Sequence, residues 1–243
     1  MITISTDAAP LPAYVARPRG EGPWPGVVIV HDIVGMSSDL RHQADWLAEE
    51  GYLAVAPDLF RGGNRVRCLF SIVSEVSRRQ EGRLTADVDA VRAWLLRQSD
   101  CSGRLGVIGF CLGGGIAVMM APTGRFDVAS VNYGAVPRGA MDVLAGSCPI
   151  VGSFGGRDRS LPSAPARLSD ALGAHNIDHD VTVYPDAGHA FLNEHDPDEV
   201  PRWVMLMGRF SRSEHHEPSA VAARQRISQF FGEHLDRRRE PQS

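Results

Sequence analysis

The chain has no excess of positive charge. Its 25 lysine and arginine residues are outnumbered by 29 aspartate and glutamate residues, which gives a formal net charge of −4 at pH 7. The densest basic run, Arg237–Arg239, is typical of a solvated tail rather than of a binding patch. Nucleic acids and anionic membrane surfaces are bound through clustered positive charge. We therefore expect neither a nucleic-acid partner nor a membrane partner.

Long apolar runs are also lacking. No segment approaches the roughly 18 apolar residues that a membrane-spanning helix requires. The first residues, MITISTDAAP, lack the basic and apolar regions of a secretory signal, so the expected location is the cytoplasm. A composition that is 43% hydrophobic and 22% charged is typical of a globular protein. A length of 243 residues fits one α/β domain, which we expect to span residues 1–243.

Cysteine is scarce, and the spacing of the cysteines predicts no disulfide bond. The sequence contains no CxxC motif and too few cysteines for a disulfide scaffold; the four are Cys68, Cys101, Cys111 and Cys148. This usage fits a reducing compartment, where thiols persist. The default interpretation of each is a small buried hydrophobic residue. Only Cys111 has neighbouring residues that indicate a functional thiol.

The histidines form no convincing metal-binding pattern. His175 and His179 are four residues apart, but Gly173 and Asn176 disfavour a helix that would bring them to one face. No acidic third ligand is evident, so we expect no zinc site. Most of the other histidines are interpreted as solvated side chains, namely His42, His195, His215 and His216.

Strand-like and helix-like segments alternate along the chain. Apolar, often β-branched runs occur at residues 26–30, 52–56, 105–108, 128–131, 150–154 and 181–184. Amphipathic stretches separate them, at residues 39–50, 85–97, 112–120, 163–173 and 220–235. The alternation predicts an α/β fold with a mostly parallel sheet and helices on both faces. Residues 2–5 and 11–17 predict an antiparallel hairpin at one sheet edge.

One stretch, residues 193–218, is long, rich in His, Asp and Pro, and predicted to be irregular. We interpret it as a possible lid or interface segment. Three placements stay open for its apolar side chains: over the substrate, in a dimer interface, or packed on the body. The side chains concerned are Trp203, Met205, Met207 and Phe210. A monomer and a homodimer both fit the sequence.

The motif GFCLGG at Gly109–Gly114 follows an apolar strand and precedes a helix. A strand ending in G-x-C-x-G-G is a nucleophile elbow with cysteine in place of serine. Gly109 and Gly113 would let strand and helix pass closely, and the helix N-terminus would favour a thiolate at Cys111. Two alternatives are a phosphate-binding turn, which neither GxGxxG nor GxxxxGK[ST] supports, and a buried structural cysteine.

An elbow nucleophile needs an acid and then a histidine, in that chain order. The motif GGRDRS follows the strand at 150–154 and offers Asp158, and PDAGHAF follows the strand at 181–184 and offers His189. Both lie at carboxyl ends of predicted parallel strands, where catalytic groups gather. We predict that His189 takes the Cys111 proton or holds it in an ion pair, and that Asp158 fixes the imidazole tautomer.

Five motifs in order, HDIVGM, APDLF, GFCLGG, GGRDRS and PDAGHAF, resemble the dienelactone hydrolase family of α/β-hydrolases. The resemblance covers about Gly26 to Leu192. It implies the α/β-hydrolase fold and a catalytic triad of Cys111, Asp158 and His189. It also implies an oxyanion hole made by the backbone amides of Leu112 and Ile33. No metal and no organic cofactor is implied.

The sequence departs from the family pattern at two positions. The family commonly has a Glu where this chain has Asp32. In the family that Glu controls the ionisation of the thiol, so the resemblance makes Asp32 the thiol-activating candidate. The alternative is that Asp32 caps the helix beginning near Ser37 or bonds its own loop. The second departure is Asn193, where dienelactone-cleaving members carry an arginine for the substrate carboxylate; Arg78 or Arg79 could supply another cation.

The expected function is hydrolysis of an ester or lactone, of the dienelactone or carboxymethylenebutenolidase type, through a cysteine thioester. The expected partner is therefore a small-molecule ester or lactone substrate. Two alternatives stay open. One is a general carboxylesterase or thioesterase of the same fold. The other is a non-catalytic protein whose thiol senses oxidants.

Overall fold

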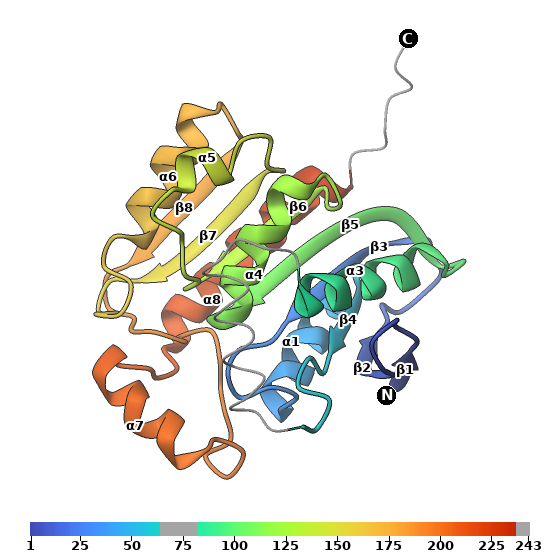
Figure 1. The fold of residues 1–243 in the computed structure, drawn as a ribbon, viewed down its shortest axis with the longest axis horizontal. Coiled ribbons are helices and arrows are strands. Elements are labelled where there is room, and N and C mark those ends of the chain that lie inside the picture. The colour runs from blue at the N-terminus through green and yellow to red at the C-terminus, as the bar shows by residue number, and fades with distance from the viewer. Residues whose placement is uncertain (64–81, 237–243) are drawn as a thin grey trace.

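The computed structural model describes residues 1–63 and 82–236 (Figure 1). Within these parts, no helix combines the length and the apolar character needed to cross a bilayer. Four of the residues and segments singled out above lie outside the described residues: Cys68, Arg78, Arg79 and Arg237–Arg239.

An eight-stranded sheet runs through the molecule in the order β1-β2-β4-β3-β5-β6-β7-β8. The strands are β1 (Ile2–Ile4), β2 (Leu11–Ala16), β3 (Trp24–Val30), β4 (Leu53–Pro57), β5 (Cys101–Phe110), β6 (Val128–Asn132), β7 (Ile150–Gly155) and β8 (His179–Tyr184). Strands β1 and β2 pair antiparallel with each other, and β2 pairs antiparallel with β4. The other pairings are parallel. The predicted mostly parallel sheet with an antiparallel edge hairpin is confirmed.

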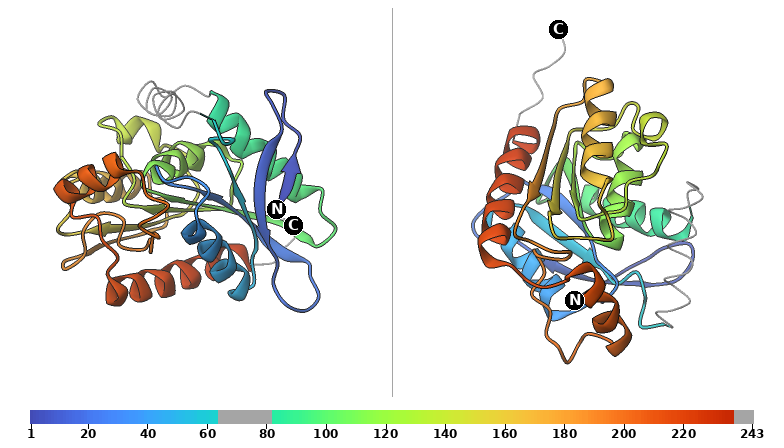
Figure 2. Two further views of the ribbon diagram at one scale, coloured as in Figure 1. Left: turned by 90° about the horizontal axis from the view of Figure 1, so that it is seen from below. Right: turned by 90° about the vertical axis from the view of Figure 1, so that its left-hand side faces the viewer.

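Helices cover both faces of this sheet, as Figure 2 shows. They are α1 (Ser38–Glu49), α3 (Arg83–Leu96), α4 (Leu112–Met120), α5 (Ala140–Val143), α6 (Ala164–Ala174), α7 (Arg202–Ser211) and α8 (Glu217–Leu235), with a short 3-10 turn at Ala121–Thr123. Apolar side chains of α3, α4 and α6 form one core with the sheet. Side chains of α1 and α8 form the second core on the opposite face.

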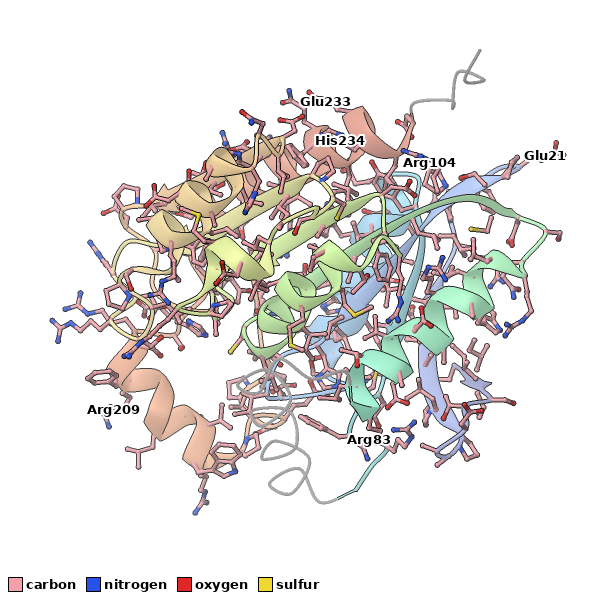
Figure 3. All side chains as sticks on the ribbon, turned by 45° about the horizontal axis from the view of Figure 1, so that its top comes forward. Glu21, Arg83, Arg104, Arg209, Glu233 and His234 are labelled. Carbon is pink, nitrogen blue, oxygen red and sulfur yellow. The ribbon has the colours of Figure 1, made fainter. Side chains whose placement is uncertain are left out.

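Strand β3 explains why the apolar runs in the sequence are continuous rather than alternating. Val28 and Val30 belong to the core under α3, α4 and α6, whereas Val27 and Ile29 belong to the core under α1 and α8. Because both faces are covered, the successive side chains from Val27 to Val30 are all buried. At the far end of the sheet, Arg104 of β5 donates a hydrogen bond to the carbonyl of His234 and so attaches the end of α8 (Figure 3).

The prediction of an irregular segment over residues 193–218 was wrong for its middle. Residues 202–211 form helix α7, and α8 begins at Glu217. Two features disguised α7 in the sequence. It begins after Pro201 without a side-chain cap, and polar residues and prolines flank it on both sides. Its periodicity was a helix signal that sequence reasoning missed, because Trp203, Leu206, Met207 and Phe210 recur at the spacing of an amphipathic helix. Trp203, Leu206 and Phe210 are nevertheless exposed, since much of the helix stands clear of the body (Figure 1).

The elbow between β5 and α4 is a close crossing of three backbone segments. Cys111 has a φ of +53°, which is unusual for a residue other than glycine. A Cβ on Gly109 would lie 2.0 Å from the carbonyl oxygen of Gly113, and one on Gly113 would lie 2.1 Å from that of Val30. Only glycine fits at these two positions, which is the reason the sequence-based interpretation gave for them.

We predict that Gly113→Ala destabilises the protein by about 3 kcal/mol, since the new methyl group meets rigid backbone and either α4 or β3 must move. Gly173→Ala is the matched control. Its Cβ would find its nearest neighbour, a His179 atom, at 3.8 Å, so the free energy of unfolding should be unchanged or rise by up to about 1 kcal/mol. Urea unfolding followed by circular dichroism measures both. A Gly113→Ala protein as stable as the parent would contradict the described crossing.

Candidate active site

Three predicted side chains meet at the carboxyl edge of the sheet. Cys111 follows β5, Asp158 follows β7, and His189 lies in the turn after β8. The Nε2 atom of His189 lies 3.1 Å from the Cys111 Sγ atom, and its Nδ1 atom donates a hydrogen bond of 2.6 Å to Asp158 Oδ2. The side chains of His189 and Asp158 are 13% and 3% exposed. The structure thus connects the Cys111 sulfur, the His189 imidazole and the Asp158 carboxylate through two consecutive contacts. We call these three groups the sulfur–imidazole–carboxylate line.

The electrostatics of this line favour a charged imidazole. Burial alone would lower the pKa of His189, but the Cys111 sulfur and the Asp158 carboxylate outweigh it and raise that pKa to about 10. Burial alone would likewise raise the pKa of Asp158, and the hydrogen bonds from His189 and Ser160 hold it below its usual value. Ser160 donates through its backbone N–H at 2.8 Å and its hydroxyl at 2.5 Å, both to Oδ1. Asp158 therefore stays an anion.

Strained backbone surrounds the three side chains. Tyr133 and Ala190, like Cys111, have positive φ values, of +40° and +58°. Tyr133 is fully buried and its ring meets the His189 ring edge-on, with 5.2 Å between centroids. Such strain persists only where surrounding contacts hold it, and it clusters at functional sites. Here the Tyr133 ring, held by such contacts, packs against the His189 imidazole and limits how that ring can turn.

Ile33 and Leu112, the predicted oxyanion-hole residues, border the same cavity as Cys111 and His189. Leu112 is the first residue of α4, where backbone N–H groups have no partner within the helix. Among residues 1–63 and 82–236, no acceptor is assigned to either amide. Two N–H donors beside the sulfur are therefore available to an oxygen atom of a bound molecule.

Asp32 borders the cavity but bonds its own loop and a histidine. Its Oδ1 atom accepts from the Val34 N–H at 2.8 Å, and its Oδ2 atom lies 2.7 Å from Nε2 of His195. Burial alone would raise the pKa of Asp32, but its bond and charge pairing with His195 lower it. Helix α1 is capped by Ser37, whose hydroxyl accepts from the Leu40 N–H. Of the two structural alternatives for Asp32, the loop bond is present and the cap is not.

Asn193 also borders the cavity, and both ends of its amide are occupied. The Tyr133 hydroxyl donates to its Oδ1 atom, and its Nδ2 atom donates to Asp39 Oδ2 at 2.6 Å. The Glu194 N–H donates to the other oxygen of Asp39 at 2.8 Å. Asn193 thus holds the start of the 193–218 segment against α1.

Sequence reasoning missed His195 and Tyr133. His195 was interpreted as a solvated side chain, but it is half-buried between Asp32 and Asp39. One signal could have identified it, since it lies six residues after His189 in the same turn. Tyr133 follows β6 directly, and the carboxyl end of a parallel strand is itself a signal for a site residue.

A cavity of about 1120 Å³ opens over the sulfur. It is bordered by the residues already named and by residues from the 193–218 segment, including part of α7. The further border residues include Leu161, Val200, Val204, Met205, Arg209, Phe210 and Arg212. Arg209 lies at the periphery of the molecule, on α7 (Figure 3).

Comparison with known proteins identifies the family of this chain. The sequence matches the dienelactone hydrolase family over residues 11–235. A Yersinia pestis protein, provisionally named a carboxymethylenebutenolidase, is 32% identical over 251 residues, which are 96% of this chain and 87% of that protein. The carboxymethylenebutenolidase of Pseudomonas putida is 30% identical over 199 residues, 77% of this chain and 83% of its own length.

Solved structures lead to the same family. The crystal structure of a Klebsiella pneumoniae protein, provisionally named a dienelactone hydrolase, superimposes with a TM-score of 0.74 at 30% sequence identity. The alignment covers 95% of this chain and 96% of that one. The predicted α/β-hydrolase fold and the predicted family are confirmed. This chain belongs to the dienelactone hydrolase family and is a carboxylic ester hydrolase.

Proposed function

We propose that the protein cleaves an ester or lactone through a thioester on Cys111. One observation carries this proposal: the sulfur lies 3.1 Å from an imidazole that is itself bonded to a buried carboxylate, in a cavity open to a small molecule. This is the arrangement that an activated thiol nucleophile requires. The dienelactone and carboxymethylenebutenolidase type of reaction, named for the relatives, is the first substrate class to test.

In the first half-reaction, the Cys111 thiolate attacks the carbonyl carbon and forms a carbon–sulfur bond. The carbonyl oxygen becomes an oxyanion, which the N–H groups of Ile33 and Leu112 would stabilise. The imidazolium of His189 gives its proton to the leaving oxygen as the ester bond breaks. An ester releases its alcohol, and a lactone opens its ring while staying attached as a thioester.

In the second half-reaction, neutral His189 takes a proton from a water molecule as the water attacks the thioester carbon. The same amides stabilise the second oxyanion. The carbon–sulfur bond then breaks, the acid leaves, and the thiolate again faces a protonated His189. Asp158 holds the imidazole in one orientation through both steps.

For Asp32 we propose a positioning role. Its bond to the Val34 N–H fixes the turn that carries the Ile33 amide, and His195 holds the carboxylate in that place. Asp32 would then act on the oxyanion hole through the backbone. The thiol-activating role implied by the family resemblance requires the negative charge of Asp32. An uncharged side chain that accepts a hydrogen bond could therefore fulfil the positioning role but not the thiol-activating role.

The alternatives use the same fold. A carboxylesterase or thioesterase would share the half-reactions and differ only in substrate. A redox-sensing thiol would need neither Asp158 nor His189, so the line formed by these two side chains favours hydrolysis. A free catalytic thiol fits a reducing compartment, and the cytoplasm stays the proposed location.

Cys111→Ala is expected to lower kcat on p-nitrophenyl acetate at least about a thousandfold, because the nucleophile is gone. Cys148→Ala should keep the activity. Burial raises the pKa of Cys148 to about 12, so that thiol is inert. Iodoacetamide should accordingly label Cys111 before Cys101 and Cys148, as peptide mass analysis can measure. Undiminished turnover by Cys111→Ala would remove the sulfur from the reaction.

The activity is expected to fall as the pH rises through about 10, where His189 loses the proton that the leaving oxygen needs. Asp158→Asn removes a carboxylate that raises the pKa of His189, so the upper pH limit of kcat/KM should move to lower pH. We also expect a loss of about a hundredfold in rate. Asp186→Asn, in the preceding turn and 68% exposed, is the control and should leave the limit in place. An unmoved limit in Asp158→Asn would contradict the assignment.

Asp32→Asn and Asp32→Ala separate the two roles of that residue. An asparagine can still accept from the Val34 N–H, so Asp32→Asn should keep kcat within about threefold. Asp32→Ala loses the bond and should lower kcat at least about tenfold with little change in KM. Steady-state kinetics on one ester measures both. Equal losses in the two variants would show that the charge itself is needed, as thiol activation requires.

A further inference from the structure

The cavity above Cys111 is larger than a small cyclic ester needs. Its volume of about 1120 Å³ slightly exceeds the range of about 300–1,000 Å³ that is usual for pockets that enclose drug-sized ligands. A monocyclic lactone placed against the sulfur would leave much of this space to water. The residues that border the remaining space therefore indicate what else the substrate carries.

Helix α7 supplies an apolar wall to that space. Val204, Met205 and Phe210 of α7 border the cavity, together with Val200 before the helix and Leu161 on the opposite loop. Val204 lies one turn before Gly208, which also borders the cavity, so one side of the helix faces it. We call Val200, Val204, Met205 and Phe210 the α7 wall.

The α7 wall is incompletely covered. Met205 and Phe210 are 44% and 68% exposed, although both border the cavity. Among the described residues, nine large hydrophobic side chains are exposed, and four of them lie on α7: Trp203, Met205, Leu206 and Phe210. Of these four, Met205 and Phe210 border the cavity, and Trp203 and Leu206 do not. Exposed apolar surface that is gathered in a concave site is a mark of ligand binding, because a hydrocarbon placed there releases water.

The wall is fixed to the catalytic turn, so a ligand on it is held in register with the sulfur. The backbone N–H of His189 donates to the carbonyl of Ser211, the last residue of α7, at 3.2 Å. A Cβ on Gly188 would lie 1.8 Å from the carbonyl oxygen of Arg212, so the two backbones touch. At the other end, the Glu199 carboxylate accepts from the N–H and hydroxyl of Ser38 on α1.

The charges around the cavity do not select an anion. Among the described border residues, the three carboxylates of Asp32, Glu194 and Glu214 outnumber the two guanidinium groups of Arg209 and Arg212. The amide of Asn193 is occupied by Tyr133 and Asp39. The balance of charge at the border therefore does not favour an anionic substrate, whereas the α7 wall offers a surface to a neutral hydrocarbon chain.

We propose that the α7 wall binds the hydrocarbon chain of a neutral carboxylic ester, so that the enzyme prefers medium-chain esters to acetate esters and to esters of equal length that end in a carboxylate. The inference rests on the proposed function, because it assigns the substrate class of the same site. It adds a binding surface to the catalytic residues.

The test is a chain-length series at concentrations below micelle formation. One series varies the acyl chain of p-nitrophenyl esters from two to eight carbons, and a second varies the alcohol chain of acetate esters over the same range. A fully buried methylene contributes about fourfold. We expect kcat/KM to rise at least about tenfold along one series. If acetate is hydrolysed and both series are flat, the inference fails while the proposed function stands. If no ester is hydrolysed, the proposed function fails.

Met205→Ser and Leu206→Ser form a matched pair on adjacent positions of α7. Met205 borders the cavity, whereas Leu206 is 69% exposed and does not. Met205→Ser should lower the ratio of octanoate to acetate kcat/KM at least about threefold, and Leu206→Ser should leave this ratio unchanged. Urea unfolding of both variants checks that the fold is intact. Equal loss of the ratio in the two variants, both folded, would overturn the α7 wall as the binding surface.

A p-nitrophenyl monoester of adipate tests the preference for a neutral chain. Its acyl chain has the length of hexanoate and ends in a carboxylate. We expect its kcat/KM to be at least about tenfold below that of p-nitrophenyl hexanoate, because burying an unpaired carboxylate against the wall is costly. A higher kcat/KM for the adipate monoester would overturn the proposal of a neutral substrate.

Discussion

The close crossing of β3, β5 and α4 is the constraint on which the site depends. Gly113 lies against the Val30 carbonyl, so the first turn of α4 is pressed onto the end of β3. This contact fixes the sulfur of Cys111 above the sheet, with the amide of Leu112 beside it. It also brings the loop after β3, which carries Ile33, next to the same helix. The positions of the Cys111 sulfur and of the Leu112 and Ile33 amides thus depend on backbone contacts rather than on side-chain packing.

The second requirement is electrostatic, since a buried imidazole is normally neutral. Burial lowers the pKa of His189, and only the anions on either side reverse that effect. The pKa of Asp158 is in turn held low, against the effect of burial, by its hydrogen bond to and charge pairing with His189, and further by two hydrogen bonds from Ser160. The charged state of the imidazole beside the sulfur therefore depends on Asp158 as well as on Cys111.

Much of the fold could be predicted because its elements carry local signals. The continuous apolar runs of β3 and β7 report strands covered on both faces, and the glycines at 109 and 113 report the elbow. The positions of Cys111, Asp158 and His189 follow from strand ends, since parallel strands bring their carboxyl ends to one edge. Helix α7 carries a periodic signal in Trp203, Leu206, Met207 and Phe210, but it has no cap and is flanked by polar residues and prolines. The sequence could not show that much of this apolar stripe stays exposed, because the place of the helix depends on contacts with distant residues.

The partners of Asp32 and Asn193 were beyond prediction for the same reason. Asp32 and His195 are 163 residues apart in the chain, and Asn193 and Asp39 are 154 apart. No local pattern records such pairs, because only the folded sheet brings α1 and the turn after β8 together. The pairs also explain how the 193–218 segment is attached to the body of the protein. Asp39 holds Asn193 and Glu194, Asp32 holds His195, and Ser38 holds Glu199.

These attachments hold the segment that contains α7 through bonds that do not involve the side chains of Cys111, His189 and Asp158. The residues from 193 to 199 are bonded to α1, and Ser211 is bonded to His189, so both ends of the segment that contains α7 are fixed. The side chains between them border the cavity without contacting the sulfur–imidazole–carboxylate line in any described bond. Substitutions on α7 can therefore alter the chain that the cavity accepts at little cost to the reaction itself. Substitutions at Asp32 or Asn193 would change the position of the whole wall, because each holds one of its attachment points.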